Sequence, residues 1–169
     1  MSSDSIKLQT YVVPLALLAA ATRIFIDLIP KLTGMNPIFY YLSFILCFFL
    51  EILFIVYVTK SFKEKNNNQL TFQEGLKVGI IIMLITGFFY SVSSFVYDTY
   101  IDPNFQVNAI LEVVGKYNPN ELEKIKQQME YSKQSPSSIG ILTSTIWFII
   151  VGFVISLVTT NFLKSNTEE

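Results

Sequence analysis

Four long apolar segments alternate with polar stretches along the chain. They cover residues 11–29, 38–59, 78–97 and 139–163. Each is long enough to cross the hydrocarbon core of a bilayer as a helix, which takes about 20 apolar residues. The pattern therefore predicts an all-α polytopic membrane protein, with four transmembrane helices in a single membrane domain over residues 1–169.

The first apolar segment contains Leu18-Ala19-Ala20-Ala21, which resembles a signal-peptide cleavage site. The apolar residues continue beyond it to Ile29, and the preceding tail is weakly charged, with Lys7 offset by Asp4. We therefore expect a first membrane helix rather than a cleaved signal. Residues 30–37, which contain two prolines and a glycine, predict a short turn after it.

The hydrophilic segment 98–138, between the third and fourth apolar segments, carries helix signals of its own. Asn118, Pro119 and Glu121 are typical of a helix start with an N-cap, a first-turn proline and a capping-box glutamate. Residues 104–117 predict another short helix. These extramembrane helices either cap the mouth of the bundle or simply close a loop, and the sequence leaves both open.

The lysines predict the orientation, because basic residues resist translocation across a membrane. With four spans, both termini and the 60–77 loop share one face, which carries Lys7, Lys60, Lys63, Lys65, Lys77 and Lys164. The other face carries Lys31, Lys116, Lys124, Lys126 and Lys133, spread more thinly. We expect both termini in the cytoplasm and residues 98–138 outside.

Small residues recur along the last two membrane segments at the spacing that lets helices approach closely in lipid. They are Gly75, Gly79 and Gly87 in the third, and Gly140, Ser144, Gly152 and Ser156 in the fourth. We expect these two helices to be neighbours in a compact bundle, although a homodimer could use the same residues.

Three ionisable side chains lie inside apolar segments: Arg23, Asp27 and Glu51. Each costs about 2.5–3.5 kcal/mol near the middle of a membrane, so these charges need partners. Counted from the predicted helix ends, Arg23 lies about 18 Å and Glu51 about 12 Å from the inner face. Their side chains lean toward each other, since each tilts toward the N-terminus of its helix. We predict an Arg23–Glu51 contact, with Asp27 nearer the outer face.

This polar cluster has two interpretations. Charges inside a membrane often mark transport or proton pathways, so the cluster is a polar site or a proton-sensitive relay. Alternatively, it is a structural ion pair that sets the register of the helices. One basic group serves two carboxylates, and that imbalance favours a functional cluster.

The composition restricts the possible chemistry. Twelve basic residues balance thirteen acidic ones, so no overall field attracts nucleic acid. Histidine is absent and Cys47 is the only cysteine, which excludes an intramolecular disulfide and a Cys/His zinc site. The chain has no phosphate-binding loop and no dinucleotide-binding motif. We expect no enzymatic activity, no metal and no cofactor.

The third apolar segment and its flanks read FQEGLKVGIIIMLITGFFYSVSSFVYDTYIDPNF from Phe72 to Phe105. An Asn-Pro-Asn-Glu-Leu-Glu helix start and a final apolar helix follow. Over nearly the whole chain, and most specifically over residues 72–79 and 100–105, this arrangement resembles the Bacteroidota family called domain of unknown function 4199 (DUF4199). The resemblance implies a four-helix inner-membrane protein of a Gram-negative bacterium, and it implies no catalytic residues.

An accessory or scaffold membrane protein is the predicted function, with the bilayer, a membrane-protein partner or a second copy of the chain as its partners. The alternative is a small transporter or channel subunit that uses Arg23, Asp27 and Glu51 at the centre of the bundle. A water-filled cavity at the Arg23–Glu51 face would favour transport, and dry packing would favour a scaffold. A membrane enzyme would depend on carboxylates such as Asp98 and Asp102, which we expect instead to cap the turn over residues 97–105.

Overall fold

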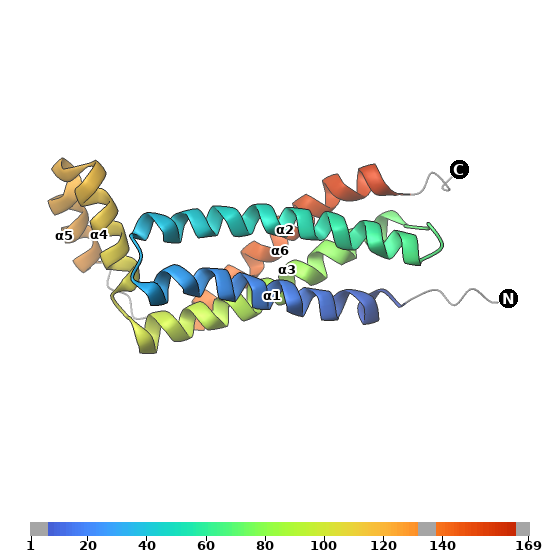
Figure 1. The fold of residues 1–169 in the computed structure, drawn as a ribbon, viewed down its shortest axis with the longest axis horizontal. Coiled ribbons are helices and arrows are strands. Elements are labelled where there is room, and N and C mark those ends of the chain that lie inside the picture. Colours follow the sequence, from blue (N-terminus) through green and yellow to red (C-terminus); the bar gives the residue numbers. More distant parts are fainter. Residues whose placement is uncertain (1–6, 132–137, 165–169) are drawn as a thin grey trace.

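The computed structural model describes residues 7–131 and 138–164, and every regular element in these ranges is helical. Four long helices run side by side along the molecule (Figure 1): α1 (Leu8–Thr33), α2 (Pro37–Lys65), α3 (Phe72–Val96) and α6 (Ser138–Leu163). A π-helical turn over Tyr97–Ile101 continues α3. All four helices are long and apolar enough to span a membrane. The all-α polytopic fold is therefore confirmed.

Two short helices lie across one end of the bundle (Figure 1). They are α4 (Phe105–Tyr117) and α5 (Leu122–Tyr131), joined by a 3-10 turn over Pro119–Glu121. α1 begins and α6 ends at the opposite end, where α2 also turns into α3 (Figure 1). Both helices predicted for the extramembrane segment are present, and α4 packs against α2 at the end of the bundle.

α1 extends about one turn beyond its predicted end and passes through Pro30. Prolines are tolerated in membrane helices because neighbouring groups satisfy the freed backbone atoms. Near the end of the helix, the Thr33 hydroxyl also donates to the Ile29 carbonyl oxygen at 2.6 Å. The helix stops at Gly34, whose φ of 63° lies in the left-handed region that favours glycine. The extra turn carries Lys31 into the bundle instead of into a loop.

The capping box of this chain lies at the start of α3. Thr71 Oγ1 accepts a hydrogen bond from the Glu74 N–H at 3.2 Å, and Glu74 Oε2 accepts one from the Thr71 N–H at 2.9 Å. The prediction of a capping box at Asn118 is wrong, because its side chain makes no capping hydrogen bond. Its carbonyl oxygen instead accepts from the Glu121 N–H at 3.1 Å, which closes the 3-10 turn.

α3 and α6 form the most extensive helix pair in the bundle. Gly79 of α3 faces Ser156 and the carbonyl oxygen of Gly152, and a Cβ built at Gly79 would overlap with the Ser156 side chain. Gly75 lies under the side chain of Thr160 in the same way, and Gly87 lies under the ring of Phe148. The small residues allow the two backbones to approach closely.

Gly140 does not take part in this contact, so the prediction for it is corrected. Among the described residues, nothing lies within 4 Å of a Cβ built at Gly140. Gly140 and Ser144 line a groove that separates the start of α6 from Ser91 and Ser94 of α3. α3 and α6 diverge at this end. The four-residue spacing of small side chains in α6 therefore extends beyond the region where the two helices are in close contact.

Candidate polar site within the bundle

Arg23 and Glu51 form a buried ion pair that joins α1 to α2. Arg23 Nη1 donates to Glu51 Oε1 at 2.9 Å, and the two side chains are 3% and 8% exposed. The structure thus brings together the two residues that the sequence pairs across helices. The pair lies near the middle of both helices, far from either end of the bundle.

Three aromatic rings surround the rest of the Arg23 guanidinium. Its Cζ lies 4.7 Å from the ring centroid of Phe44, 4.5 Å from that of Tyr90 and 5.4 Å from that of Phe148. Arg23 Nε and Nη2 have no hydrogen-bond partner among the described residues, so these ring faces supply their electrostatic contacts. Because the rings come from α2, α3 and α6, one arginine connects all four long helices.

Asp27 pairs with Lys31 one turn along α1. Asp27 Oδ2 lies 2.7 Å from Lys31 Nζ, an ion pair whose angles fall outside those of a hydrogen bond. The Tyr90 hydroxyl donates to Asp27 Oδ1 at 3.4 Å. Sequence reasoning placed Lys31 on the outer membrane face, because the predicted helix stopped before it. Two cations therefore match two carboxylates, and the charge imbalance that favoured a functional cluster is absent.

A second group of aromatic rings encloses Lys31. Its Nζ lies 5.2 Å from the ring centroid of Tyr40, 5.0 Å from that of Tyr97 and 5.8 Å from that of Phe105. The Tyr97 hydroxyl also donates to the Lys31 carbonyl oxygen at 3.1 Å. Sequence reasoning missed this site. The four-residue spacing of Asp27 and Lys31 was the available signal, since such pairs share a helix face.

α4 closes this aromatic group from outside the bundle. The Phe105 ring packs edge-on against Tyr40 at 5.1 Å and against Tyr97 at 5.7 Å between centroids. Gln106 Nε2 donates to the Tyr40 hydroxyl at 2.9 Å. Residues from α1, α2, the π-helical turn and α4 therefore meet around one buried ammonium group.

Asp98 and Asp102, the two acidic residues near the end of α3, have different roles. Asp102 Oδ1 accepts from the Asn104 N–H at 3.2 Å, so it caps the turn as expected. Asp98 does not: its Oδ2 accepts from the Ser94 hydroxyl on the same helix at 3.2 Å. Within residues 7–131 and 138–164, no group of three or more His, Cys, Asp or Glu side chains is placed to hold a metal ion.

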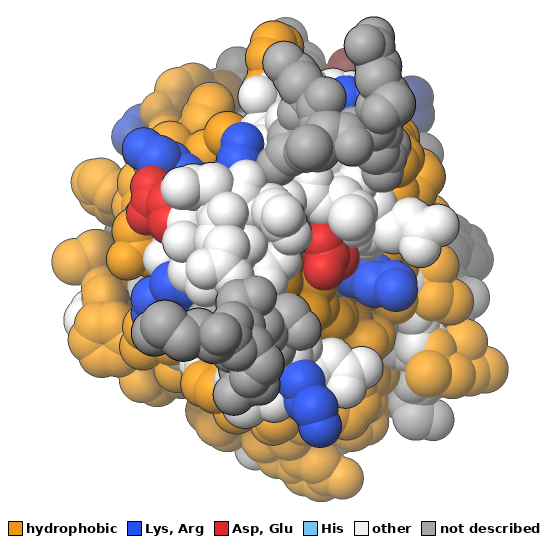
Figure 2. Space-filling view, turned by 90° about the vertical axis from the view of Figure 1, so that its right-hand side faces the viewer, with side chains coloured by type: hydrophobic (Ala, Val, Ile, Leu, Met, Phe, Trp, Pro, Cys, Tyr) orange, Lys and Arg blue, Asp and Glu red, His pale blue; other side chains and the backbone are white. Residues whose placement is uncertain are grey.

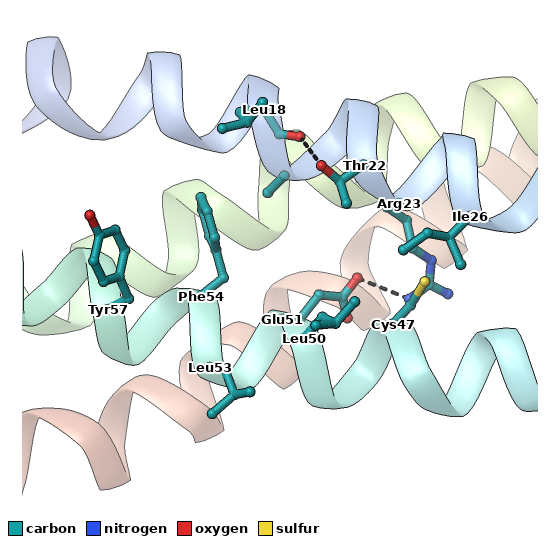
Figure 3. Close-up of a pocket in the computed structure, with 11 residues that line it drawn as sticks. Leu18, Thr22, Arg23, Ile26, Cys47, Leu50, Glu51, Leu53, Phe54 and Tyr57 are labelled. Carbon is teal, nitrogen blue, oxygen red and sulfur yellow. Dashed lines mark hydrogen bonds and ion pairs between the residues drawn. The ribbon is translucent and has the colours of Figure 1, made fainter.

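An apolar groove between α1 and α2 reaches the Arg23–Glu51 pair from the side of the bundle (Figure 3). Its volume is about 330 Å³. The pair therefore lies between aromatic rings on one side and an apolar groove on the other, and neither surface is a polar passage along the bundle.

Comparison with known proteins shows a match to a protein family. A family model described as "Protein of unknown function (DUF4199)" matches residues 12–165. No curated protein and no solved structure matches the chain.

Proposed function

The chain belongs to the DUF4199 family, whose description assigns no activity, and we propose that it is an accessory or interaction protein of the membrane rather than an enzyme or a transporter. Its partners are the bilayer and another membrane protein, or a second copy of the chain. It needs no cofactor and binds no nucleic acid.

The closed pairing of the charges inside the bundle carries this proposal. Arg23 is paired with Glu51 and Asp27 with Lys31, and aromatic rings cover both cations. Transport through this cluster would require its ionisable groups to exchange ions or protons with water. Here the charges stabilise the contacts between helices and the docking of α4, which suits a rigid structure that presents a surface.

The distribution of lysines supports an orientation with both termini in the cytoplasm. Figure 2 shows the end of the molecule where α1 begins and α6 ends, with basic side chains gathered around it. Exposed lysines of this end are Lys7, Lys60, Lys65, Lys77 and Lys164. Lys31 is buried, so it no longer counts for the other face. By the positive-inside rule, this end lies on the cytoplasmic side of the inner membrane, and α4 and α5 lie on the outer side.

Flux measurements on the reconstituted protein separate the two candidate functions. Liposomes that contain the purified chain are loaded with a pH-sensitive dye, and proton and potassium fluxes are followed under an imposed potential. We expect the same fluxes as in empty liposomes, for both the wild-type protein and Glu51→Gln. A flux through the wild-type protein above that of empty liposomes would instead establish the transporter.

Photocrosslinking in cells tests the interaction role directly. A photoreactive amino acid at Gln127, on the exposed side of α5, is compared with one at Leu142, on the lipid-exposed side of α6. We expect discrete protein adducts at one or both positions, with those at Gln127 lost when Phe105→Ala releases α4. Absence of any discrete adduct at either position would contradict the proposed role.

A further inference from the structure

The groove between α1 and α2 opens on the side of the bundle (Figure 3), the surface that faces the hydrocarbon when these two helices span a membrane. Leu18, Leu53 and Tyr57 line it and are 58%, 65% and 63% exposed on the side of the bundle. Its volume of about 330 Å³ falls within the range of small-molecule sites. A molecule that fills the groove would therefore enter from the bilayer and carry an apolar body.

The polar groups of the groove gather at one end of it. Thr22, Arg23, Cys47 and Glu51 are its polar or ionisable lining residues apart from Tyr57. Thr22 already donates to the Leu18 carbonyl oxygen at 2.9 Å, and rings cover Arg23. Glu51 uses Oε1 for Arg23, whereas Oε2 has no hydrogen-bond partner among the described residues. The groove thus offers one strong acceptor, the free oxygen of a buried carboxylate.

The depth and charge of this acceptor restrict the head group. Glu51 lies at the middle of α2, where a charged head group is costly in the hydrocarbon core. The pair is already neutral, since Arg23 balances Glu51. A carboxylate oxygen away from water is stabilised when a donor reaches it. An uncharged head group that donates a hydrogen bond suits the depth of the site, leaves the ion pair neutral and supplies a donor to the carboxylate oxygen.

We propose that the groove binds an uncharged, membrane-dissolved amphiphile whose hydroxyl group donates a hydrogen bond to Glu51 Oε2. Its apolar chain lies against Leu18, Leu53 and Phe54, which line the groove beyond the ion pair. This site stands apart from the proposed interaction role, which uses α4–α5 and the outer helix faces.

Photolabelling with a matched pair of probes tests the site. The full chain is placed in phosphatidylcholine nanodiscs with a hexadecanol that carries a mid-chain diazirine, or with the methyl ether of the same probe, which lacks the donor. Labelled peptides are identified by mass spectrometry. We expect the alcohol to label residues 18–26 and 47–57 about tenfold more than the ether, the effect of roughly 1.4 kcal/mol. Unlabelled hexadecanol should compete.

Two substitutions of similar size provide the control. Leu53→Trp fills the groove without touching the ion pair, whereas Leu142→Trp adds the same ring at a similarly exposed position of α6 outside the groove. Labelling should fall with Leu53→Trp and persist with Leu142→Trp. Equal labelling by alcohol and ether, or labelling that Leu53→Trp leaves unchanged, would overturn the proposal and show adventitious lipid contact only.

Discussion

Arg23 shows how one residue stabilises a junction of four helices. Its guanidinium is planar, so one edge donates to Glu51 while its faces lie against the rings of Phe44, Tyr90 and Phe148. A lysine would offer a compact charge without those faces. The pair is buried, and a buried charge is tolerated only while its partner is present.

Removal of one member of this pair should destabilise the protein strongly. We expect Glu51→Gln to lower the free energy of unfolding by about 3–5 kcal/mol, because Arg23 is left as an uncompensated buried charge. The double variant Arg23→Met, Glu51→Met should lose much less, since both charges disappear together. Thermal unfolding in a mild detergent measures both effects.

An exposed ion pair offers the matched control for that measurement. Lys60 and Glu64 are 4.0 Å apart in α2, with side chains 66% and 59% exposed. Glu64→Gln should leave the unfolding temperature essentially unchanged, because exposed pairs contribute little. If Glu51→Gln behaves like Glu64→Gln, the buried pair does not stabilise the bundle as described.

Gly79 and Gly140 should respond differently to the same substitution. A Cβ at Gly79 would lie 3.0 Å from the Gly152 carbonyl oxygen and overlap with Ser156, so Gly79→Ala should cost about 1–3 kcal/mol of stability. Gly140→Ala meets no described atom within 4 Å and should be neutral or slightly stabilising. Equal unfolding temperatures for the two variants would show that α3 and α6 are not in close contact at Gly79.

At the scale of helices, the exact length of α1 decides which charges meet. The extra turn of α1 beyond its predicted end includes Lys31. It places Lys31 next to Asp27 and among the rings of Tyr40, Tyr97 and Phe105. The continuation of α3 as a π-helical turn positions Tyr97 for its hydrogen bond to Lys31. The ends of the membrane helices therefore build the surface on which α4 docks.

Phe105 should be the main anchor of α4. We expect Phe105→Ala to remove the ring contacts with Tyr40 and Tyr97 and to release α4–α5, so that trypsin cleaves after Lys116 and Lys124 faster. Tyr117→Ala is the control on the same helix, because Tyr117 is 62% exposed. Limited proteolysis followed by mass spectrometry measures the rates, and equal rates for the two variants would contradict a docked α4.

At the scale of the whole molecule, the bundle has two different ends. One combines the beginning of α1, the end of α6 and a rim of lysines, and the other is covered by α4 and α5 (Figures 1 and 2). Lys63 Nζ also donates to the Leu163 carbonyl oxygen at 2.8 Å, which ties α2 to the C-terminus of α6. The arrangement requires that the two ends lie on opposite sides of the membrane.

Cysteine accessibility tests this topology. Single cysteines replace Gln69, in the α2–α3 connection, or Asn120, in the 3-10 turn between α4 and α5, in a Cys47→Ser background. An impermeant maleimide should label Asn120→Cys in intact spheroplasts and Gln69→Cys only after lysis, because the proposed orientation places the lysine-rich end in the cytoplasm. The opposite pattern would reverse the orientation, and labelling of both in intact cells would contradict a four-span topology.

The sequence by itself determined that this protein has four helices of membrane-spanning length, and it determined the main contacts between them. Apolar segments of membrane-spanning length, small residues repeated every four positions and two charges of opposite sign in neighbouring helices each predict structure from short-range rules. The four helices, the α3–α6 contact and the Arg23–Glu51 pair follow from those rules, because each depends on the spacing along a regular helix.

Only the tertiary structure decided which groups complete those contacts. The partner of Asp27, the rings around Arg23 and Lys31, and the separation of Gly140 from α3 all depend on where helices end and how they diverge. Tyr40 is far from Tyr97 and Phe105 in the chain, and the three rings meet only because α4 folds back onto the bundle. Such contacts arise from packing in three dimensions, which the spacing of residues along one helix does not specify.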